Sequence, residues 1–439
     1  MKTKRTISLL LSFVVLLSAV VFTVPMSVSA ASNDIAATYS LQAYQAFLDN
    51  IVNVKDFTGV AYVTKNGKVL CQSANGMQNT KKNQPMTMDT LFPLGSVSKQ
   101  FCATAVLLLQ EDGKLSVNDT LDKYFPEYEI GKDVTIQNLL TMRSGIRDHV
   151  NIDYDYKGHE IPTDQYTLLN TSTAKENHKA ITDWLFTQEL KFTPGTSYSY
   201  SNANFLLLSI IVEKVSGMTY PDFVKENIFA PLNMTHSGFY EELVHSPDLA
   251  EHSFPIGIRP SDPDYHGLSQ GAGDLVSNAE DMDKWLTSLY ECTLLSQESY
   301  KEMTTDYGEN YGYGIGVDTK NGLIGHQGNI ATYESYACTY PNEKINIFVI
   351  TNDVDKMYSK NLSMATFANA ISRKITTNLL LGDVDSDSEV SILDATAIQL
   401  HFAQIKALSE EQINNGDTDG DKELSVLDAT AIQLFLAQL

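Results

Sequence analysis

The sequence has few cysteines and no cluster of them. Its 439 residues include four cysteines, which match neither a small disulfide framework nor a metal-binding pattern. The hydrophobic content of 43% and the aromatic content of 10% are sufficient for a substantial core and exclude a disordered chain. Cys102 lies among apolar residues and is predicted to be buried. The sequence leaves open whether Cys71 and Cys338 form a disulfide.

Positive charge is also scarce. The chain carries 31 Lys and Arg against 54 Asp and Glu, and its formal net charge is −23. Such an acidic protein repels nucleic acids and anionic lipid surfaces. We therefore expect no nucleic-acid partner and no electrostatic binding to a membrane.

One nearly continuous apolar run, at residues 9–24, stands near the start of the chain. Lys2, Lys4 and Arg5 precede it, and the small residues 28–30 follow at the position of a cleavage site. This pattern predicts a signal peptide over residues 1–30 and a secreted, extracellular protein with no membrane attachment after cleavage. A membrane anchor is the alternative, because the run approaches spanning length. No Cys offers a site for lipid attachment.

The order of the predicted elements indicates one sheet built from both ends of a large domain. Alternating residues around Asn66-Gly67 predict a hairpin over residues 58–71. The helix expected at 96–112 is followed by Gly113, which is typical of a helix end. Strands near both ends and helices between them favour a sheet with a helical subdomain inserted. The other expected elements are helices at 41–52, 205–215 and 359–376, and strands at 313–317, 333–340 and 344–352.

Ser96 and Lys99 are the first candidate catalytic residues. They stand three residues apart at the start of an apolar helix, so both side chains project from one face. A serine nucleophile needs a neighbour that accepts its proton, and burial lets a lysine do so by lowering its pKa. Ser172 and Lys175 have the same spacing, but they lie in a polar stretch.

Two further elements support this site. Tyr200 and Asn202 combine a phenol, which can act as a general base, with an amide that can orient the substrate and Lys99. His326 and Gly328 precede the strand at 333–340; the glycine allows an edge strand to approach a substrate, and the histidine supplies a donor. Two other pairs have the same spacings but are set aside. Tyr340 and Asn342 lie in a predicted turn, and His236 and Gly238 lie in a loop.

The ordered set of these motifs over residues 40–376 resembles the serine β-lactamase and penicillin-binding-protein family, especially class C-like β-lactamases and DD-peptidases. Further similar stretches are 139–145, 271–273 with Asp281, and 311–314. The resemblance implies an α/β (α+β) fold, with an antiparallel sheet flanked by helices and a helical subdomain. No cofactor is implied for catalysis.

The resemblance also implies a role for each site residue. Ser96 becomes the acylated nucleophile, Lys99 its proton partner, Tyr200 the general base and acid, and Asn202 a substrate-orienting amide. The backbone N–H groups of Ser96 and Asn329 would form the oxyanion hole. His326 departs from β-lactamases, which carry Lys at this position, and this favours DD-peptidase, D-aminopeptidase or esterase relatives.

The last sixty residues contain an internal repeat. Residues 393–400 recur unchanged as 427–434, and each copy follows an acidic loop. The side chains at loop positions 1, 3, 5 and 12, with the carbonyl at position 7, suit Ca²⁺. The first loop has Asp383, Asp385, Asp387, Glu389 and Asp394, and the second has Asp417, Asp419, Asp421, Glu423 and Asp428.

This tail resembles a dockerin, a small all-α calcium-binding module that attaches enzymes to the cohesins of a cellulosomal scaffoldin. Unlike ordinary EF-hands, it has no Gly at position 6 and ends each loop in Asp. The resemblance implies two calcium ions, a cohesin partner and association with a cellulosome. It places Ile392, Leu393, Val426 and Leu427 near the partner surface.

The expected organisation is a signal peptide (1–30), a hydrolase domain (31–376), a linker (377–381) and a dockerin domain (382–439). The substrate stays open between a D-amino-acid peptide, as for a D-Ala-D-Ala carboxypeptidase, a β-lactam and an ester such as a cell-wall polysaccharide ester. A non-catalytic β-lactam or peptide sensor is the second class of function, although the complete set of Ser96, Lys99, Tyr200 and Asn202 favours catalysis.

Overall fold

The computed structural model describes residues 44–150, 173–251, 267–376, 382–385, 391–418 and 423–437. The predicted signal peptide and the linker at 377–381 lie outside these residues. Ser172 and four of the expected calcium ligands, Asp387, Glu389, Asp419 and Asp421, also lie outside them.

The larger part of the chain is built on a six-stranded antiparallel sheet in the order β2-β1-β11-β10-β9-β8. The sheet joins both ends of this part, since β1 pairs with β11 along six residues. This arrangement confirms the predicted antiparallel sheet. The strands are β1 (Gly59–Lys65), β2 (Lys68–Asn75), β8 (Gly316–Asp318), β9 (Leu323–Ile330), β10 (Tyr333–Tyr340) and β11 (Ile345–Thr351).

The β1–β2 hairpin turns at Asn66 and Gly67, as expected. Both residues have positive φ angles, 51° and 70°, which a two-residue hairpin turn with the twist of the sheet requires. Two shorter sheets complete the strands. They consist of β3 (Met77–Asn79), β4 (Gln84–Pro85), β5 (Phe92–Pro93), β6 (Gly238–Phe239) and β7 (Leu275–Ser277).

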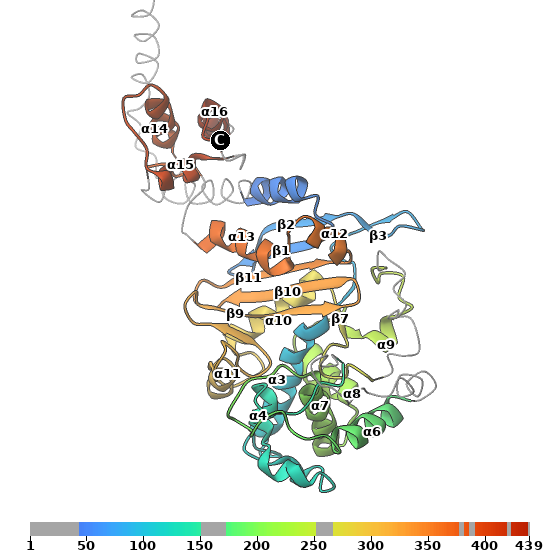
Figure 1. Cartoon of the computed structure of the whole chain (residues 1–439). Coiled ribbons are helices and arrows are strands. Elements are labelled where there is room, and N and C mark those ends of the chain that lie inside the picture. Colours follow the sequence, from blue (N-terminus) through green and yellow to red (C-terminus); the bar gives the residue numbers. More distant parts are fainter. Residues whose placement is uncertain are drawn as a thin grey trace, which may run out of the picture.

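Helices cover both faces of the sheet (Figure 1). On one face, the helix at residues 44–55 buries Leu48 and Val52, which are one turn apart. It packs there with α12 (Val354–Ser359) and α13 (Met364–Thr376) in one hydrophobic cluster. On the other face, α10 (Ala279–Glu291) lies against β1, β10 and β11.

The helix α3 (Ser98–Glu111) connects the sheet to the helical region. Eleven of its fourteen residues are buried. Trp285 of α10 stacks on Phe101 with ring centroids 3.9 Å apart, and its indole N–H donates to Gln100 at 2.9 Å. The helix α7 (Asn202–Ser216) packs beside α3. The other helices of this region are α4 (Ile136–Leu140), α6 (Ala174–Leu185), α8 (Tyr220–Val224), α9 (Tyr240–Leu243) and α11 (Gln297–Met303).

Two predicted elements differ from the structure. The strand expected at 313–317 begins only at Gly316, because Gly314 has a φ of 65° and a turn brings the N–H of Gly312 to the carbonyl of Ile315. The helix expected from residue 359 begins at Met364, because residues 354–359 form the separate helix α12.

The open question of a disulfide is answered by the sheet order. Cys71 lies on β2 and Cys338 on β10, with β1 and β11 between them. Neighbouring strands are about 4.8 Å apart, so three strand spacings separate the two residues by more than twice the distance that a disulfide spans. All four cysteines are free thiols.

The tail forms a small all-α module with its own core. Its helices are α14 (Ile392–Phe402), α15 (Glu410–Gly416) and α16 (Val426–Ala437). The two helices that begin in the repeated sequence, α14 and α16, pack against each other. The core of the module consists of Val384, Ala395, Ala397, Ile398, Leu408, Ala429 and Ile432.

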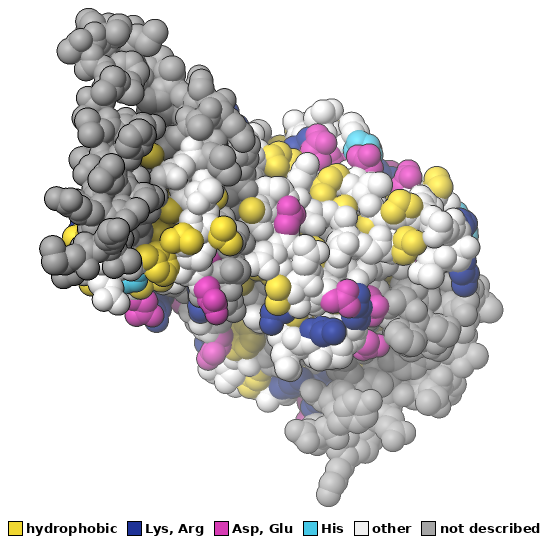
Figure 2. All heavy atoms as spheres, turned by 90° about the horizontal axis from the view of Figure 1, so that it is seen from above, with side chains coloured by type: hydrophobic (Ala, Val, Ile, Leu, Met, Phe, Trp, Pro, Cys, Tyr) yellow, Lys and Arg dark blue, Asp and Glu magenta, His cyan; other side chains and the backbone are white. Residues whose placement is uncertain are grey.

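On the face shown in Figure 2, hydrophobic side chains lie among charged side chains of both signs. Exposed apolar residues scattered in this way are common on globular proteins. In the described parts of the chain, we find no helix with the length and apolar content needed to cross a membrane.

Candidate active site

Ser96 lies in a short 3-10 helix, Gly95–Val97, that leads directly into α3. The carbonyl of Gly95 accepts a hydrogen bond from the Ser98 hydroxyl at 2.7 Å, which fixes this turn. Gly95 has a φ of 56°, and a Cβ atom there would lie 2.9 Å from the backbone nitrogen of Asn329. A glycine is therefore required for the backbone before Ser96 to approach β9.

Lys99 is fully buried one helical turn after Ser96. Its Nζ donates to Ser96 Oγ at 2.9 Å, to Asn202 Oδ1 at 2.8 Å and to the carbonyl of Ala272 at 2.7 Å. Burial lowers the pKa of Lys99 to about 7, although Asp148 and Asp274 oppose the shift. Lys99 is thus placed to exchange a proton with Ser96 near neutral pH.

Tyr200 and Asn202 enter the site from the start of α7. The Tyr200 hydroxyl is hydrogen bonded to Ser96, and burial raises the pKa of this phenol. The Nζ of Lys99 lies 4.9 Å from the centre of the Tyr200 ring. Asn202 begins α7 and faces Lys99 with its amide oxygen. The structure therefore brings all four of these predicted residues together.

His326 lies on β9, but its ring does not offer the expected donor to a substrate. Its Nδ1 is 2.5 Å from the carbonyl of Gln327, which can only accept, so the proton resides on Nδ1. Its Nε2 then accepts from the Tyr311 hydroxyl at 3.0 Å. Burial, together with the nearby Lys99, lowers the pKa of His326 to about 3. The ring is neutral, and both of its nitrogens are engaged within the protein.

Gly328 and Asn329 bring the edge of β9 against the nucleophile. A Cβ atom at Gly328 would lie 1.9 Å from the carbonyl oxygen of Leu94, which also accepts from the Ser335 hydroxyl at 2.7 Å. Beyond Gly325, the outer edge of β9 is not paired with β8, so this edge faces the segment that carries Ser96. The backbone N–H of Asn329 is accordingly a candidate oxyanion donor.

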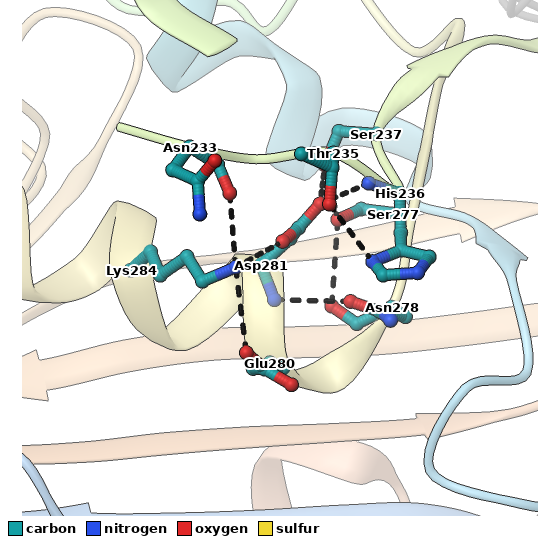
Figure 3. A network of polar contacts seen from close by, with 9 residues as sticks. All are labelled: Asn233, Thr235, His236, Ser237, Ser277, Asn278, Glu280, Asp281 and Lys284. Atoms are coloured by element: carbon teal, nitrogen blue, oxygen red, sulfur yellow. Dashed lines mark hydrogen bonds and ion pairs between the residues drawn. The ribbon is translucent and has the colours of Figure 1, made fainter. Parts of the chain in front are cut away.

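The three alternative matches lie elsewhere. Lys175 is exposed on α6, Tyr340 ends β10, and Asn342 lies in the turn between β10 and β11. The match at His236 belongs to the network drawn in Figure 3. There, Asp281 accepts from the His236 N–H at 2.7 Å and from Lys284 at 2.8 Å. This network fixes the loop before β6 to α10 and contains none of the catalytic candidates.

Sequence reasoning missed three groups that contact the site. Asp148 accepts from Asn202 Nδ2 at 2.9 Å, the carbonyl of Ala272 binds Lys99, and Tyr311 donates to His326. The stretches at 271–273 and 311–314 resemble the family, but a resemblance does not specify a contact. A single Asp such as Asp148 carries no spacing signal, so its place becomes visible only in the folded chain.

In the tail, one cluster of carboxylates fits a hard cation. Oxygen atoms of Asp383, Asp385 and Asp394 lie within 4.8 Å of one another. Asp394 accepts backbone N–H groups from Val384 at 2.6 Å and Ser391 at 2.7 Å, which tie the loop to α14. Burial raises the pKa of Asp394.

The second copy repeats this geometry 34 residues later. Asp428 accepts from the backbone N–H of Thr418 at 2.8 Å and of Ser425 at 2.7 Å. In both copies, the Asp at position 12 therefore accepts from the backbone at equivalent positions. The apolar residues expected at the partner surface are more than half exposed: Ile392 54%, Leu393 57%, Val426 57% and Leu427 68%.

Comparisons with known proteins match both parts of the chain. The model of the β-lactamase family matches residues 45–367, and that of the type I dockerin domain matches residues 381–436. A Bacillus subtilis protein named as a penicillin-binding protein, PbpX, is 32% identical over 286 residues, which are 64% of this chain and 67% of that protein. Penicillin-binding protein 4* of the same organism is 26% identical and aligns over 70% of this chain and 71% of its own length.

Solved structures show the same fold. A penicillin-binding protein from Bacillus halodurans has a TM-score of 0.60 and 25% identity, with 75% of this chain and 99% of that chain covered. A D-amino acid amidase from Ochrobactrum anthropi has a TM-score of 0.59 and 24% identity, with 76% and 97% covered. The chain belongs to the β-lactamase family, whose members are generally serine hydrolases. It carries in addition a C-terminal type I dockerin, a module that generally binds calcium.

The close approach at Gly328 generates a first prediction. Gly328→Ala places a methyl group against the Leu94 carbonyl and should force β9 away from Ser96. If Asn329 supplies an oxyanion donor, kcat/KM for a p-nitrophenyl ester should fall about 100-fold. Gly67→Ala is the control for backbone strain alone, because Gly67 has a φ of 70° but a Cβ atom there meets nothing within 4 Å; it should lower the melting temperature and keep kcat/KM. Full activity in Gly328→Ala would show that this approach is not needed.

Proposed function

We propose that the protein is a secreted serine hydrolase that forms an acyl-enzyme at Ser96 during hydrolysis of ester or amide substrates. The observation that carries this proposal is the set of three hydrogen bonds around Lys99 Nζ. Two of the acceptors are carbonyl oxygens, which cannot donate. As an ammonium, Lys99 donates to all three acceptors. Once neutral, its amine has two hydrogens and one lone pair, so its hydrogens go to the carbonyls and its lone pair faces Ser96.

The acylation step follows from this arrangement. Lys99 takes the proton of the Ser96 hydroxyl while Oγ bonds to the substrate carbonyl carbon. The N–H groups of Ser96 and Asn329 stabilise the negative charge on the substrate oxygen. When the tetrahedral intermediate collapses, the bond to the leaving alcohol or amine breaks, and the proton reaches the leaving group from Lys99 through Tyr200. Water then cleaves the acyl-enzyme with the same groups acting in reverse.

The neutral ring of His326 supports a preference among substrates. DD-carboxypeptidase substrates and penicillins carry a free carboxylate, which a cationic side chain binds well. His326 is neutral and uses both nitrogens within the protein. We therefore favour esters and amides without a free carboxylate next to the scissile bond, which include esters of cell-wall polysaccharides.

The tail adds a docking function to the hydrolase. We propose that each acidic loop holds one Ca²⁺, the first through Asp383, Asp385, Asp387, Glu389 and Asp394 and the second through their counterparts 34 residues later. Calcium would neutralise the clustered carboxylates and fix the loops. The ordered module would then bind a cohesin of a scaffoldin through Ile392, Leu393, Val426 and Leu427. In this proposal, residues 1–30 are cleaved on export and residues 377–381 link the two domains.

Covalent labelling tests the nucleophile. A fluorophosphonate probe should add one label per chain, on the peptide that contains Ser96, because Lys99 activates that hydroxyl. Ser96→Ala should abolish both the label and ester hydrolysis, measured by mass spectrometry and absorbance. Ser172→Ala is the control and should keep both; label on Ser172 would refute the assignment.

A second prediction concerns substrate charge. His326→Lys supplies a cation and should raise kcat/KM for benzylpenicillin, relative to that for a neutral p-nitrophenyl ester, about tenfold. A charged hydrogen bond of about 1.5 kcal/mol gives this factor. His326→Gln, which adds no charge, should leave the ratio unchanged. An equal ratio in the Lys and Gln variants would show that this position does not sense charge.

A third prediction concerns calcium. The isolated residues 377–439 should gain helical circular dichroism when Ca²⁺ is added and lose it in EGTA, because repulsion between the loop carboxylates opposes folding. Ester hydrolysis by the full-length protein should survive EGTA, since the hydrolase domain has its own core. Full helicity of the tail in EGTA, or loss of hydrolysis, would contradict two independent modules.

A further inference from the structure

Asp148 is a buried acid that the proposed mechanism does not use. Its side chain is 4% exposed. The Oδ2 atom accepts from Asn202 Nδ2 at 2.9 Å, and the Oδ1 atom accepts from the backbone N–H of Val150 at 3.0 Å. The carboxylate thus lies directly behind the amide that contacts Lys99. Burying a carboxylate is costly, so its place here requires an explanation.

The contact with Asp148 fixes which end of the Asn202 amide faces Lys99. An ionised carboxylate can only accept hydrogen bonds, whereas an amide has one accepting and one donating end. In the observed orientation, Nδ2 donates to Asp148 and Oδ1 accepts from Lys99. The reverse orientation would put two oxygen atoms against each other and leave the amide N–H₂ facing the lysine.

The orientation of the amide decides where the lone pair of Lys99 points. With Asn202 Oδ1 and the carbonyl of Ala272 as acceptors, both hydrogens of the neutral amine are used, and the lone pair faces Ser96 Oγ. With the amide reversed, its N–H₂ group would donate to Nζ and occupy the lone pair. The lysine could then no longer accept the serine proton.

We propose that Asp148 is a positioning residue that holds the Asn202 amide with its oxygen on Lys99 and thereby directs the lysine lone pair to Ser96. This inference rests on the proposed acylation of Ser96 and deepens it. Asp148 acts through Asn202.

The charge of Asp148 has a second, measurable effect. Several titratable groups face Lys99 or act on its charge. They are Asp148, Asp274, Cys102, Tyr200, His149 and His326. Asp148 acts to raise the pKa of Lys99. Removing its charge should therefore lower that pKa and move the acid limb of the pH–rate profile to lower pH.

The experiment uses three substitutions in the full-length protein. Asp148→Asn removes the charge and supplies an amide that permits either orientation of Asn202, Asp148→Ala removes the partner, and Asp148→Glu keeps a carboxylate. The control is Asp281→Asn, which alters a buried Asp that is bonded to Lys284 and His236, in a network that contains none of the catalytic candidates. We would measure kcat/KM for a p-nitrophenyl ester from pH 5 to 10, the rate of fluorophosphonate labelling of Ser96, and the melting temperature.

The wild type should lose activity as the pH falls through about 7, where Lys99 becomes protonated. In Asp148→Asn and Asp148→Ala, the acid limb should move down by about one pH unit. The plateau should also fall at least about tenfold. In Asp148→Glu, the acid limb should stay at the same pH as in the wild type. Asp281→Asn should lower the melting temperature without moving the limb.

Three outcomes would overturn the inference. The first two leave the proposed function standing, and the third does not. If wild-type Ser96 is labelled but Asp148→Asn keeps the position of the limb and the plateau, Asp148 has only a structural role. If Asp148→Asn loses activity in proportion to its folded fraction, with the limb in place, the conclusion is the same. If wild-type Ser96 does not react with the probe, the proposed function fails, and the inference fails with it.

Discussion

The burial of Lys99 is the constraint on which the active site depends. A lysine ammonium without water is unfavourable unless its hydrogens find acceptors, and the fold supplies three of them from three separate segments. Ser96 comes from the turn before α3, Asn202 from the start of α7, and Ala272 from the loop before β7. The packing of α3 against α7 and α10 thus positions Lys99 and its hydrogen-bond partners. A shift of α7 or α10 relative to α3 would leave a buried polar group unsatisfied.

Sequence patterns predicted the parts of this site that have a fixed spacing. The Ser96–Lys99 pair lies one helical turn apart, and the hairpin at Asn66-Gly67 follows from backbone conformation, so both could be predicted locally. The family resemblance then joined Tyr200, Asn202 and His326 to them. The strand expected at 313–317 was misplaced, because the φ of 65° at Gly314 ends the extended backbone and no periodicity reveals this.

What the sequence could not predict are contacts between segments far apart in the chain. Asp148 meets Asn202 from 54 residues away, and the carbonyl of Ala272 meets Lys99 from 173 residues away. The neutral state of His326 likewise depends on burial and on the nearby Lys99. Burial and such contacts determine whether Lys99 and His326 are charged. The same residue types, packed differently, could therefore act on a different substrate. The tail was more predictable, since its repeat determines its geometry: the bonds of Asp394 recur at Asp428.

The central claim is that Lys99 is a base at neutral pH because burial lowers its pKa. A direct titration of this lysine tests that claim. The protein would be labelled with ¹³C-lysine, the Lys99 Cε signal assigned with Lys99→Met, and its chemical shift followed by NMR from pH 5 to 11. The account predicts a midpoint near the pKa of about 7. A midpoint above about 10, the ordinary value for lysine, would contradict it.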